Sequence, residues 1–299
     1  MKVGIIGAGS IGLLFAGYLS RIFTVTVYTR TNEQANVINQ NGIVLLHESE
    51  EIRTQVKALP INDWQGLEDI TLIAVKQYQL SPIIERVKQF TSSSKSLLFL
   101  QNGMGHLKLL DQIPSNHLFV GSVEHGALKE NPYTVRHNGV STTNVAVYKG
   151  DTNFLRNFAT AVSDVFPMTF QEDFFEMLKK KLIANALINP LTAILQVKNG
   201  ALVENPFYFQ VLQNLFSEIT NILNLEEPEE YWKQVLKICT NTADNRSSML
   251  KDIEAKRQTE VDAILGYLLE EANKQKKKSP QIGTMYHLIK GKESKEGLV

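Results

Sequence analysis

The sequence has a single cysteine, Cys239, among its 299 residues, which excludes a disulfide framework within the chain. It also lacks an excess of either charge, because 31 basic residues balance 31 acidic ones. This balance argues against nucleic acid or an anionic membrane as the main partner. No apolar run reaches the roughly 18 residues that a membrane-spanning helix needs. The start of the chain, Met1-Lys2-Val3, leads directly into a strand and does not resemble a signal peptide, so we expect a cytoplasmic protein.

Metal-ligand spacing is also missing. The six histidines are scattered at positions 47, 106, 117, 125, 137 and 287, and we expect no metal site. Hydrophobic residues make up 43% of the chain and charged residues 21%, which favours a packed core. The length is typical of about two domains.

A glycine-rich turn follows the first predicted strand, Lys2–Ile6, and precedes a helical pattern. The order strand, G-x-G-x-x-G, helix is typical of a dinucleotide-binding site, and a simple glycine turn is the alternative. Gly7 allows the tight turn, Gly9 lets the backbone approach a pyrophosphate, and Gly12 lets the helix pack against the strand. The free N–H groups of the helix start favour phosphate. The residues predicted to bind the cofactor here are Gly7, Ala8, Gly9, Ser10, Ile11 and Gly12.

Arg30 follows the second predicted strand, Val25–Tyr28. NAD enzymes usually place Asp or Glu at this point to accept a hydrogen bond from the ribose 2′-hydroxyl. A guanidinium group instead binds a 2′-phosphate through paired hydrogen bonds. Arg30 therefore predicts a preference for NADP, with a solvated surface arginine as the alternative.

Two further apolar runs, Thr71–Val75 and Leu97–Leu100, are typical of buried parallel strands. Lys76 and Asn102 follow them closely, at the carboxyl ends where doubly wound sheets bind ligands. A surface cation and an Asn-Gly turn are the alternatives.

The next segment is predicted to complete the sheet. Leu118–Val123 forms another strand, and the alternation of residues 133–148 predicts a β-hairpin at the sheet edge. Glu124 and His125 have the chemistry of an acid/base pair, but a hydrogen-bonded structural histidine is favoured.

Beyond about residue 151 only helical patterns remain. The fold class is therefore α/β, with a Rossmann-type doubly wound domain at residues 1–167 and an all-α substrate domain at 168–299. Pro190 should kink or end the central helix, which begins near residue 173. The other predicted helices span residues 152–165, 205–224, 229–242 and 249–276.

The central helix carries polar side chains at Lys181, Asn185 and Asn189 among apolar neighbours. Residues four apart lie on one face of a helix, so the three form a narrow polar line on a buried rod. An unpaired buried amide costs about 1–3 kcal/mol, so these groups need partners or a polar cavity. Substrate binding and a satisfied core network both meet that need.

Two polar positions accompany the last predicted helix. Ser247 and Ser248 are suited to cap its start, and Ser248 is assigned to the cap. Glu260 is predicted on the apolar face of the same helix, where a carboxylate is unusual unless it is paired or functional. A salt bridge with Lys256 or Arg257 is the alternative.

Together these motifs resemble the ketopantoate reductase (2-dehydropantoate 2-reductase) family from Met1 to about residue 290. The glycine turn is common to many dehydrogenases, whereas the Asn-Pro-Leu-Thr-Ala and Ser-Ser-Met-Leu blocks are specific to the family. The tail after Ser279 shows little likeness, and no site residue is assigned there. The matching blocks are Gly7–Gly12, Gln101–Gly103, Lys181–Ala193, Lys198–Gly200, Asn245–Leu250 and Arg257–Glu260.

The resemblance implies a fold like that of 6-phosphogluconate dehydrogenase and NADPH-dependent reduction of 2-dehydropantoate to pantoate. By this resemblance Lys181 is the catalytic lysine and Glu260 the active-site glutamate, which is also placed near the cofactor. The same resemblance assigns substrate binding to Asn102, Asn185, Asn189 and Ser248, and cofactor contacts to Arg30, Lys76 and Asn102.

Two other functions are compatible with the same fold. The chain is also compatible with an NADP-linked reductase of a different 2-keto acid, or with an NADPH sensor that does not turn over. A sensor has no need of a proton donor in a buried polar line, which favours an enzyme. The apolar helical domain also permits a homodimer.

Overall fold

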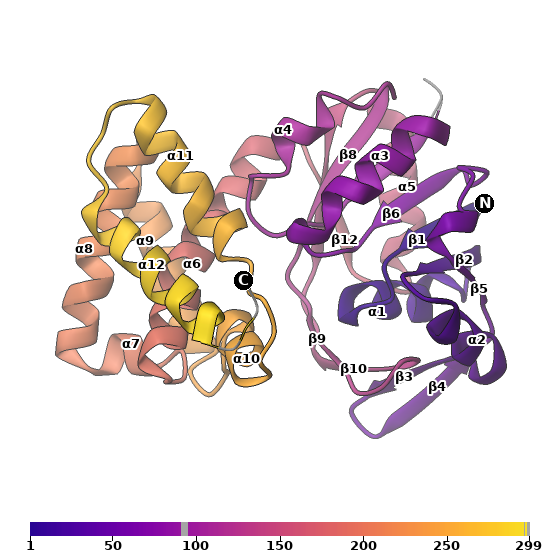
Figure 1. Ribbon diagram of the computed structural model, residues 1–299, viewed down its shortest axis with the longest axis horizontal. Coiled ribbons are helices and arrows are strands. Elements are labelled where there is room, and N and C mark those ends of the chain that lie inside the picture. Colours follow the sequence, from indigo (N-terminus) through magenta and orange to yellow (C-terminus); the bar gives the residue numbers. More distant parts are fainter. Residues whose placement is uncertain (91–94, 296, 298–299) are drawn as a thin grey trace. The chain divides into compact units, whose positions relative to one another are not determined.

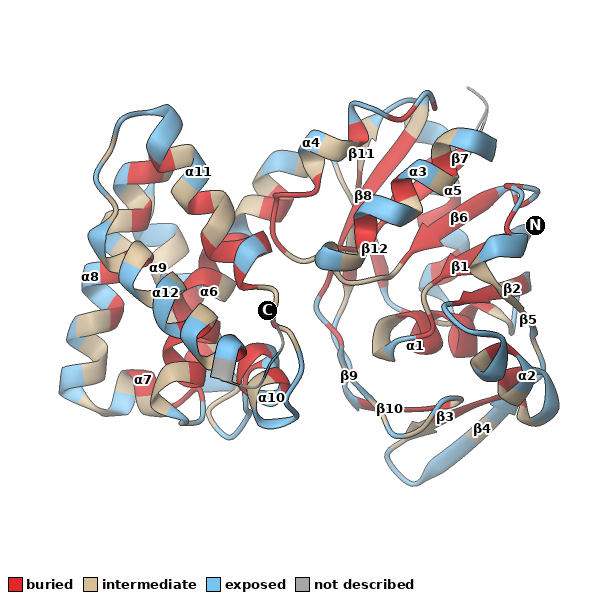
Figure 2. Cartoon of the chain, viewed as in Figure 1, coloured by how far each residue is buried: buried red, intermediate tan, exposed pale blue. Residues whose placement is uncertain are grey.

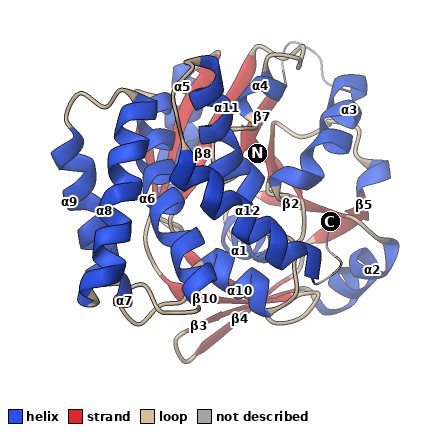
Figure 3. Ribbon diagram, turned by 60° about the vertical axis from the view of Figure 1, so that its left-hand side comes forward, coloured by secondary structure: helices blue, strands red, loops and turns tan. Residues whose placement is uncertain are grey.

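The computed structural model describes residues 1–90, 95–295 and 297, and it divides into two compact units (Figure 1). The first unit comprises Met1–Gln101 and Leu107–Met177, and the second comprises Asn102–His106 and Leu178–Val299. The first is α/β and the second is helical, which confirms the predicted fold class (Figure 3).

An eight-stranded sheet forms the centre of the first unit. Its strands from β5 to β8 run parallel, β11 pairs antiparallel with β8, and β12 pairs parallel with β11. The strand order reverses between β1 and β6, which is the switch point where such sheets bind ligands. In spatial order the strands are β12 (Met168–Gln171), β11 (Thr143–Lys149), β8 (His117–Val123), β7 (Ser96–Phe99), β6 (Ile70–Ile73), β1 (Lys2–Ile6), β2 (Thr24–Thr29) and β5 (Lys57–Pro60).

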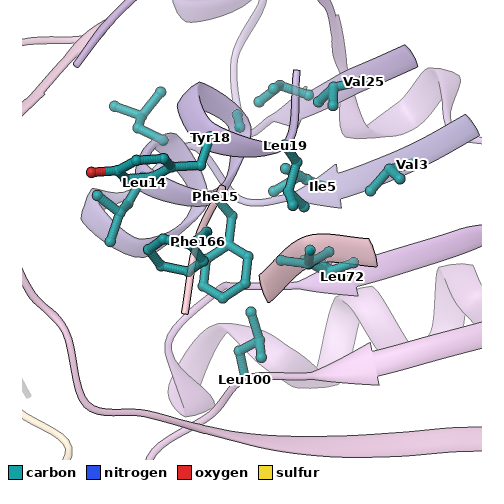
Figure 4. Packing of buried hydrophobic residues seen from close by; sticks show 14 of the residues in the cluster. Val3, Ile5, Leu14, Phe15, Tyr18, Leu19, Val25, Leu72, Leu100 and Phe166 are labelled. Carbon is teal, nitrogen blue, oxygen red and sulfur yellow. The ribbon is translucent and has the colours of Figure 1, made fainter. Parts of the chain in front are cut away.

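Helix α1 (Ser10–Leu19) lies between this sheet and a smaller one, which explains why it is buried all round. Its Phe15 ring meets Phe166 edge-on at 5.0 Å, and its Tyr18 ring stacks on Phe166 at 4.8 Å (Figure 4). Each fully buried side chain of this size stabilises the fold by about 1.5–3 kcal/mol. The other helices of this unit are α2 (Asn32–Asn41), η1 (Ile61–Asp63), η2 (Gln77–Gln79), α3 (Leu80–Phe90), α4 (Leu107–Leu110) and α5 (Thr152–Ser163).

The smaller sheet shows that the predicted hairpin at residues 133–148 is wrong. Strand β10 pairs with β3 and β9, whereas β11 pairs with β8 and β12 in the large sheet. Alternation identifies a strand and its buried face, but it does not identify the partner that supplies the hydrogen bonds. In spatial order the four strands are β4 (Glu50–Thr54), β3 (Ile43–His47), β10 (Thr134–Gly139) and β9 (Gly126–Lys129).

The second unit is built around α6 (Phe174–Leu195), which begins in the first unit and is mostly buried (Figure 2). Pro190 does not end this helix, which continues for five more residues to Leu195. None of the helices in the described part of the chain is both long and apolar enough to cross a bilayer. The remaining helices are α7 (Ala201–Glu204), α8 (Pro206–Leu223), α9 (Pro228–Asn241), α10 (Ser248–Glu254), η3 (Asp262–Gly266), α11 (Tyr267–Lys274) and α12 (Pro280–Lys295).

The single helix predicted for residues 249–276 is also wrong. Helix α10 ends at Glu254, and Lys256 takes a left-handed backbone conformation with φ of 51° before η3 begins at Asp262. A non-glycine residue in that conformation interrupts a right-handed helix. The apolar periodicity continues on both sides of the break, so it does not reveal the break. The first unit continues past residue 167 to Met177, and β12 pairs with β11 in its large sheet.

Candidate functional site

The glycine turn after β1 has the backbone that its sequence predicts. Gly7 has a φ of +107°, which disfavours any side chain. A Cβ on Gly12 would lie 1.7 Å from the Gly7 carbonyl oxygen, so the start of the helix approaches the turn as closely as glycine allows. A Cβ on Gly9 would meet no atom within 4 Å. The outer face of the turn is therefore open at the position where a pyrophosphate would approach.

Helix α1 offers free donors at this opening. Gly9 is its N-cap residue and makes no side-chain capping hydrogen bond, and the first turn contains no acidic residue. The backbone N–H groups and the positive end of the helix dipole are therefore available to an anion. The turn, with Ala8 buried and Ser10 and Ile11 partly exposed, fits the phosphates of a dinucleotide.

Two side chains anchor the turn through the carbonyl oxygen of Ala8. Gln34 Nε2 and Lys129 Nζ each donate a hydrogen bond of 3.0 Å to that oxygen. Burial lowers the pKa of Lys129, and the nearby positive charge of Arg30 lowers it further. Sequence reasoning missed Lys129, because it ends a short strand without a recognisable motif. The structure therefore brings a second cation close to Arg30.

Arg30 is exposed beside an open hollow of about 650 Å³ at the end of β2. This hollow also contains the carboxylates of Glu33 and Asp63. A 2′-phosphate would suit the arginine, whereas a 2′-hydroxyl would suit a carboxylate. The remaining lining residues are Thr31, Asn32, Pro60 and Asn62.

Lys76 follows β6 at the switch point of the sheet and is partly buried. The segment before it is fixed by Gln101, whose Nε2 donates 2.9 Å hydrogen bonds to the carbonyl oxygens of Ile73 and Val75. Among the residues that the structure describes, the buried Oε1 of Gln101 has no hydrogen-bond partner. The glycine turn and Lys76 thus follow the two adjacent strands at which the sheet order reverses.

In the second unit, Lys181, Asn185 and Asn189 all lie on α6, as the spacing predicts. Lys181 and Asn185 are partly exposed, whereas Asn189 is buried with 6% exposure. The six residues between them are all buried: Leu182, Ile183, Ala184, Ala186, Leu187 and Ile188. The polar line therefore runs from the surface of the helical unit into its interior.

The buried end of this line contacts the start of α10. Asn189 Nδ2 donates to Ser248 Oγ at 3.4 Å, and Thr192 Oγ1 lies 2.7 Å from Ser247 Oγ. Ser247 caps α10 by accepting a hydrogen bond from the Leu250 N–H group, so the assignment of this cap to Ser248 is wrong. Because Ser247 faces inward as the cap, Ser248 is exposed and its hydroxyl is oriented toward Asn189.

The loop before α10 is held by the Lys198-Asn199-Gly200 block. The backbone N–H groups of Asn199 and Gly200 donate to the carbonyl oxygens of Asn245 and Ala243, at 3.0 Å and 3.1 Å. A Cβ on Gly200 would lie 2.7 Å from the Cβ of Ala243, so glycine is needed for this close approach. This block therefore fixes the loop that presents Ser248.

Asn102 and Glu260 meet in the second unit. Asn102 Nδ2 donates to Glu260 Oε2 at 2.8 Å. Gly103, with a φ of +75°, brings the chain so close to η3 that a Cβ would lie 2.2 Å from the Ala263 carbonyl oxygen. Arg257, one of the two alternative partners considered for Glu260, pairs with Asp252 at 3.1 Å. Glu260 thus precedes η3 and does not lie within a continuous helix.

Glu124 and His125 have structural partners. Glu124 accepts a hydrogen bond of 2.8 Å from Asn144 Nδ2. His125 Nδ1 lies 3.1 Å from His137 Nε2, and the other ring nitrogen of His137 lies 2.8 Å from the Tyr18 hydroxyl. Burial lowers the pKa of His137, as does the nearby His47. The favoured reading of His125 as a structural histidine fits these contacts.

The predicted site residues fall into one group in each unit. The first unit holds the glycine turn, Arg30 and Lys76. No group of three His, Cys, Asp or Glu side chains in the described ranges is arranged to hold a metal ion. The second unit holds Asn102, Lys181, Asn185, Asn189, Ser248 and Glu260.

Comparisons with known proteins identify relatives along nearly the whole chain. The family model described as Ketopantoate reductase PanE/ApbA matches residues 3–150, and the model of its C-terminal part matches residues 173–293. A 2-dehydropantoate 2-reductase of Bacillus subtilis (strain 168) is 42% identical over 298 residues, which cover 98% of each chain. One from Listeria monocytogenes is 36% identical and covers 98% of this chain and 97% of its own.

Solved structures show the same fold. The crystal structure of the probable 2-dehydropantoate 2-reductase from Bacillus subtilis superimposes with a TM-score of 0.90 at 40% identity, covering 98% of this chain and 100% of that one. A dimeric ketopantoate reductase from Staphylococcus aureus has a TM-score of 0.83 and covers 99% of this chain and 100% of its own. At 21% identity, it shows a common fold alone.

Proposed function

Because this chain belongs to the ketopantoate reductase family, we propose that it reduces 2-dehydropantoate to (R)-pantoate with NADPH, a step in pantothenate and coenzyme A synthesis. The observation that carries this proposal is the hydrogen bond from Asn102 to Glu260. A chain segment from the end of the nucleotide-binding sheet thereby contributes a polar group to the helical unit. The bond joins Asn102, assigned to both cofactor and substrate, to the glutamate assigned to the active site.

The cofactor proposal rests on the glycine turn, Lys76, Arg30 and Lys129. The open face at Gly9 and the uncapped start of α1 would hold the pyrophosphate. Arg30 and Lys129 would supply positive charge for the 2′-phosphate, which NADPH has and NADH lacks. When bound, a nicotinamide cofactor would be the source of the hydride that reduces the substrate carbonyl.

The chain's own residues would handle the charge and the proton. Hydride addition to a 2-keto acid develops negative charge on the carbonyl oxygen. The ammonium group of Lys181 would stabilise that charge and donate a proton to the oxygen. Because Lys181 lies at the accessible end of the polar line on α6, it can exchange its proton with solvent after each turnover.

The remaining polar groups would orient the substrate. Ser248 lies in the first turn of α10, where its hydroxyl and nearby N–H groups suit a carboxylate. Asn185 and Asn189 would supply amide donors and acceptors along α6. Glu260, held by Asn102, would accept a hydrogen bond from a substrate hydroxyl.

A homodimer is a further proposal, for which sedimentation velocity is the test.

The test of this function is a substrate and cofactor panel followed through the loss of NADPH absorbance. We expect 2-dehydropantoate to be turned over faster than pyruvate or 2-ketoisovalerate. We also expect its turnover to be faster with NADPH than with NADH. Turnover with only another keto acid would identify that acid as the substrate and leave the proposed mechanism unchanged. NADPH binding without turnover of any substrate would instead indicate a sensor.

A further inference from the structure

Glu293 is a fully buried glutamate in α12, the helix that follows Ser279. Its Oε1 accepts two hydrogen bonds of 2.7 Å from Thr259, one from the backbone N–H and one from the hydroxyl. Its Oε2 lies 3.0 Å from Lys290 Nζ. Burying a carboxyl group without such partners would cost folding free energy, so these contacts fix the Glu293 side chain in place.

Thr259 transmits this contact directly to Glu260. Thr259 is itself buried, with 1% exposure, and its hydroxyl oxygen accepts a hydrogen bond of 3.2 Å from the Val261 N–H group. The residues on both sides of Glu260 are thus fixed by one hydroxyl group. Because the backbone of Glu260 is fixed, its carboxylate can reach Asn102 Nδ2 at 2.8 Å.

The same face of α12 also contacts Asp262, which lies three residues after Thr259 on the other side of Glu260. Tyr286 donates a hydrogen bond of 2.7 Å to Asp262 Oδ1, and Lys290 Nζ lies 3.2 Å from Asp262 Oδ2. Tyr286, Lys290 and Glu293 are spaced four and three residues apart, which places them on one helix face. This face therefore holds both sides of the turn that carries Glu260.

We propose that Glu293 is a positioning residue for the reaction: through Thr259, it sets the position from which Glu260 meets Asn102 and the substrate. The inference rests on the proposed function, because it assumes that Glu260 contacts the substrate. A sequence signal for it exists. Ile282, Ile289 and Glu293 lie seven and four residues apart, so the glutamate extends the buried apolar face of α12.

The matched control is Glu218, which attaches the other end of α12. Its two carboxylate oxygens accept hydrogen bonds from the N–H groups of Gln281 and Ile282, at 3.1 Å and 2.8 Å. Glu218→Ala therefore loosens the same helix without touching the turn at Glu260. A general loss of helix packing would affect both variants alike.

The experiment compares Glu293→Ala, Glu293→Gln, Thr259→Val and Glu218→Ala in the full chain, by steady-state kinetics, thermal unfolding and NADPH titration. Glu293→Ala and Thr259→Val are expected to lower kcat/KM for 2-dehydropantoate by about 10- to 100-fold, as for outer partners of functional groups. Glu293→Gln keeps an acceptor for Thr259 and should retain most activity. NADPH affinity should change much less than kcat/KM in all four.

A double-mutant cycle separates positioning from packing. If Glu293 acts through Glu260, then Glu293→Ala should cause no further loss of kcat/KM in a Glu260→Ala background. An additive loss, or an equal loss in Glu218→Ala, would overturn the inference. If Glu293→Ala fails to fold, Thr259→Val carries the same comparison. A wild-type protein without turnover would instead remove the proposed function itself.

Discussion

The carboxamide of Asn102 donates a 2.8 Å hydrogen bond to the carboxylate of Glu260, across 158 positions of sequence. A hydrogen bond to a charged group contributes about 1.5–3 kcal/mol, and about 1.4 kcal/mol changes a rate tenfold. Asn102→Ala is therefore expected to lower kcat/KM by roughly 10- to 100-fold. A cycle with Glu260→Ala measures the coupling between the two residues. Independent effects of the two substitutions would mean that this hydrogen bond does not contribute to the reaction.

Lys181→Ala should reduce turnover by at least about 100-fold, because general acid catalysis typically contributes that much. Cofactor affinity should change much less than turnover, since the glycine turn, Arg30 and Lys76 lie in the other unit. Lys180→Ala is the matched control, because Lys180 is the adjacent lysine on α6 and is exposed. Single-turnover kinetics measure the chemical step. Near-wild-type turnover of Lys181→Ala would discard the proton-donor role.

The second and third glycines of the turn, Gly9 and Gly12, should respond differently to alanine. Gly9→Ala should leave the melting temperature unchanged, because its Cβ would meet no atom within 4 Å. The same methyl group would fill the open face and weaken NADPH binding. Gly12→Ala should destabilise the fold, because its Cβ would lie 1.7 Å from the Gly7 carbonyl oxygen. Isothermal titration and thermal unfolding measure the two effects, and unchanged NADPH affinity in Gly9→Ala would place the pyrophosphate elsewhere.

Arg30→Ala is expected to raise the KM for NADPH by about tenfold or more, since a hydrogen bond to a charged phosphate contributes about 1.5–3 kcal/mol. The KM for NADH should hardly change, because NADH carries no 2′-phosphate. Lys129→Ala should likewise raise the KM for NADPH more than the KM for NADH. Arg21→Ala, at another exposed arginine of the same unit, provides the control. An equal rise for both cofactors would show that Arg30 does not read the 2′-phosphate.

Stability should decrease in acid because of His106. This side chain is fully buried, neither ring nitrogen has a partner among the described residues, and burial lowers its pKa to about 4. The unfolded chain, with the ordinary histidine pKa of 6.5, binds more protons between these two values. The contribution of His106 to the free energy of unfolding is thus present above pH 6.5 and is lost as the pH falls toward 4. The loss amounts to about 3 kcal/mol in total.

Thermal unfolding between pH 4 and 7.5 measures this effect. His106→Leu should flatten the pH dependence relative to the wild type, whereas His287→Leu, at an exposed histidine, should not. A slope in His106→Leu equal to that of the wild type would assign the acid sensitivity to other groups, such as His137, whose pKa is also lowered.

Local patterns predicted the elements that nucleotide binding depends on. The glycine turn, the strand on either side of the switch point and the line of three polar residues on α6 all lie where their spacing indicates. These features depend on backbone preferences and on periodicity within a few residues, which a sequence carries directly. The roles assigned to Lys181, Glu260 and the other site residues stay predictions.

Features that depend on distant partners were missed or misread. The strands at residues 134–149 alternate correctly but pair in two different sheets. Ser247, and not Ser248, caps α10, and the buried hydroxyl of Ser247 also accepts a hydrogen bond from Thr192. Lys129 carries no motif, and its partner Ala8 lies in a distant segment. The spacing that places Glu293 on the buried face of α12 does not identify its partner Thr259, which is 34 positions away.

By itself the sequence determined the α/β class, the two-part organisation, the glycine turn and the polar line on the central helix, because each follows from short-range sterics and hydrophobic period. Only the tertiary structure decided that Asn102 meets Glu260 and that Glu293 holds the turn beneath it. The physical reason is that a hydrogen bond between distant segments depends on how the whole unit packs. Nothing in either segment alone specifies that partner.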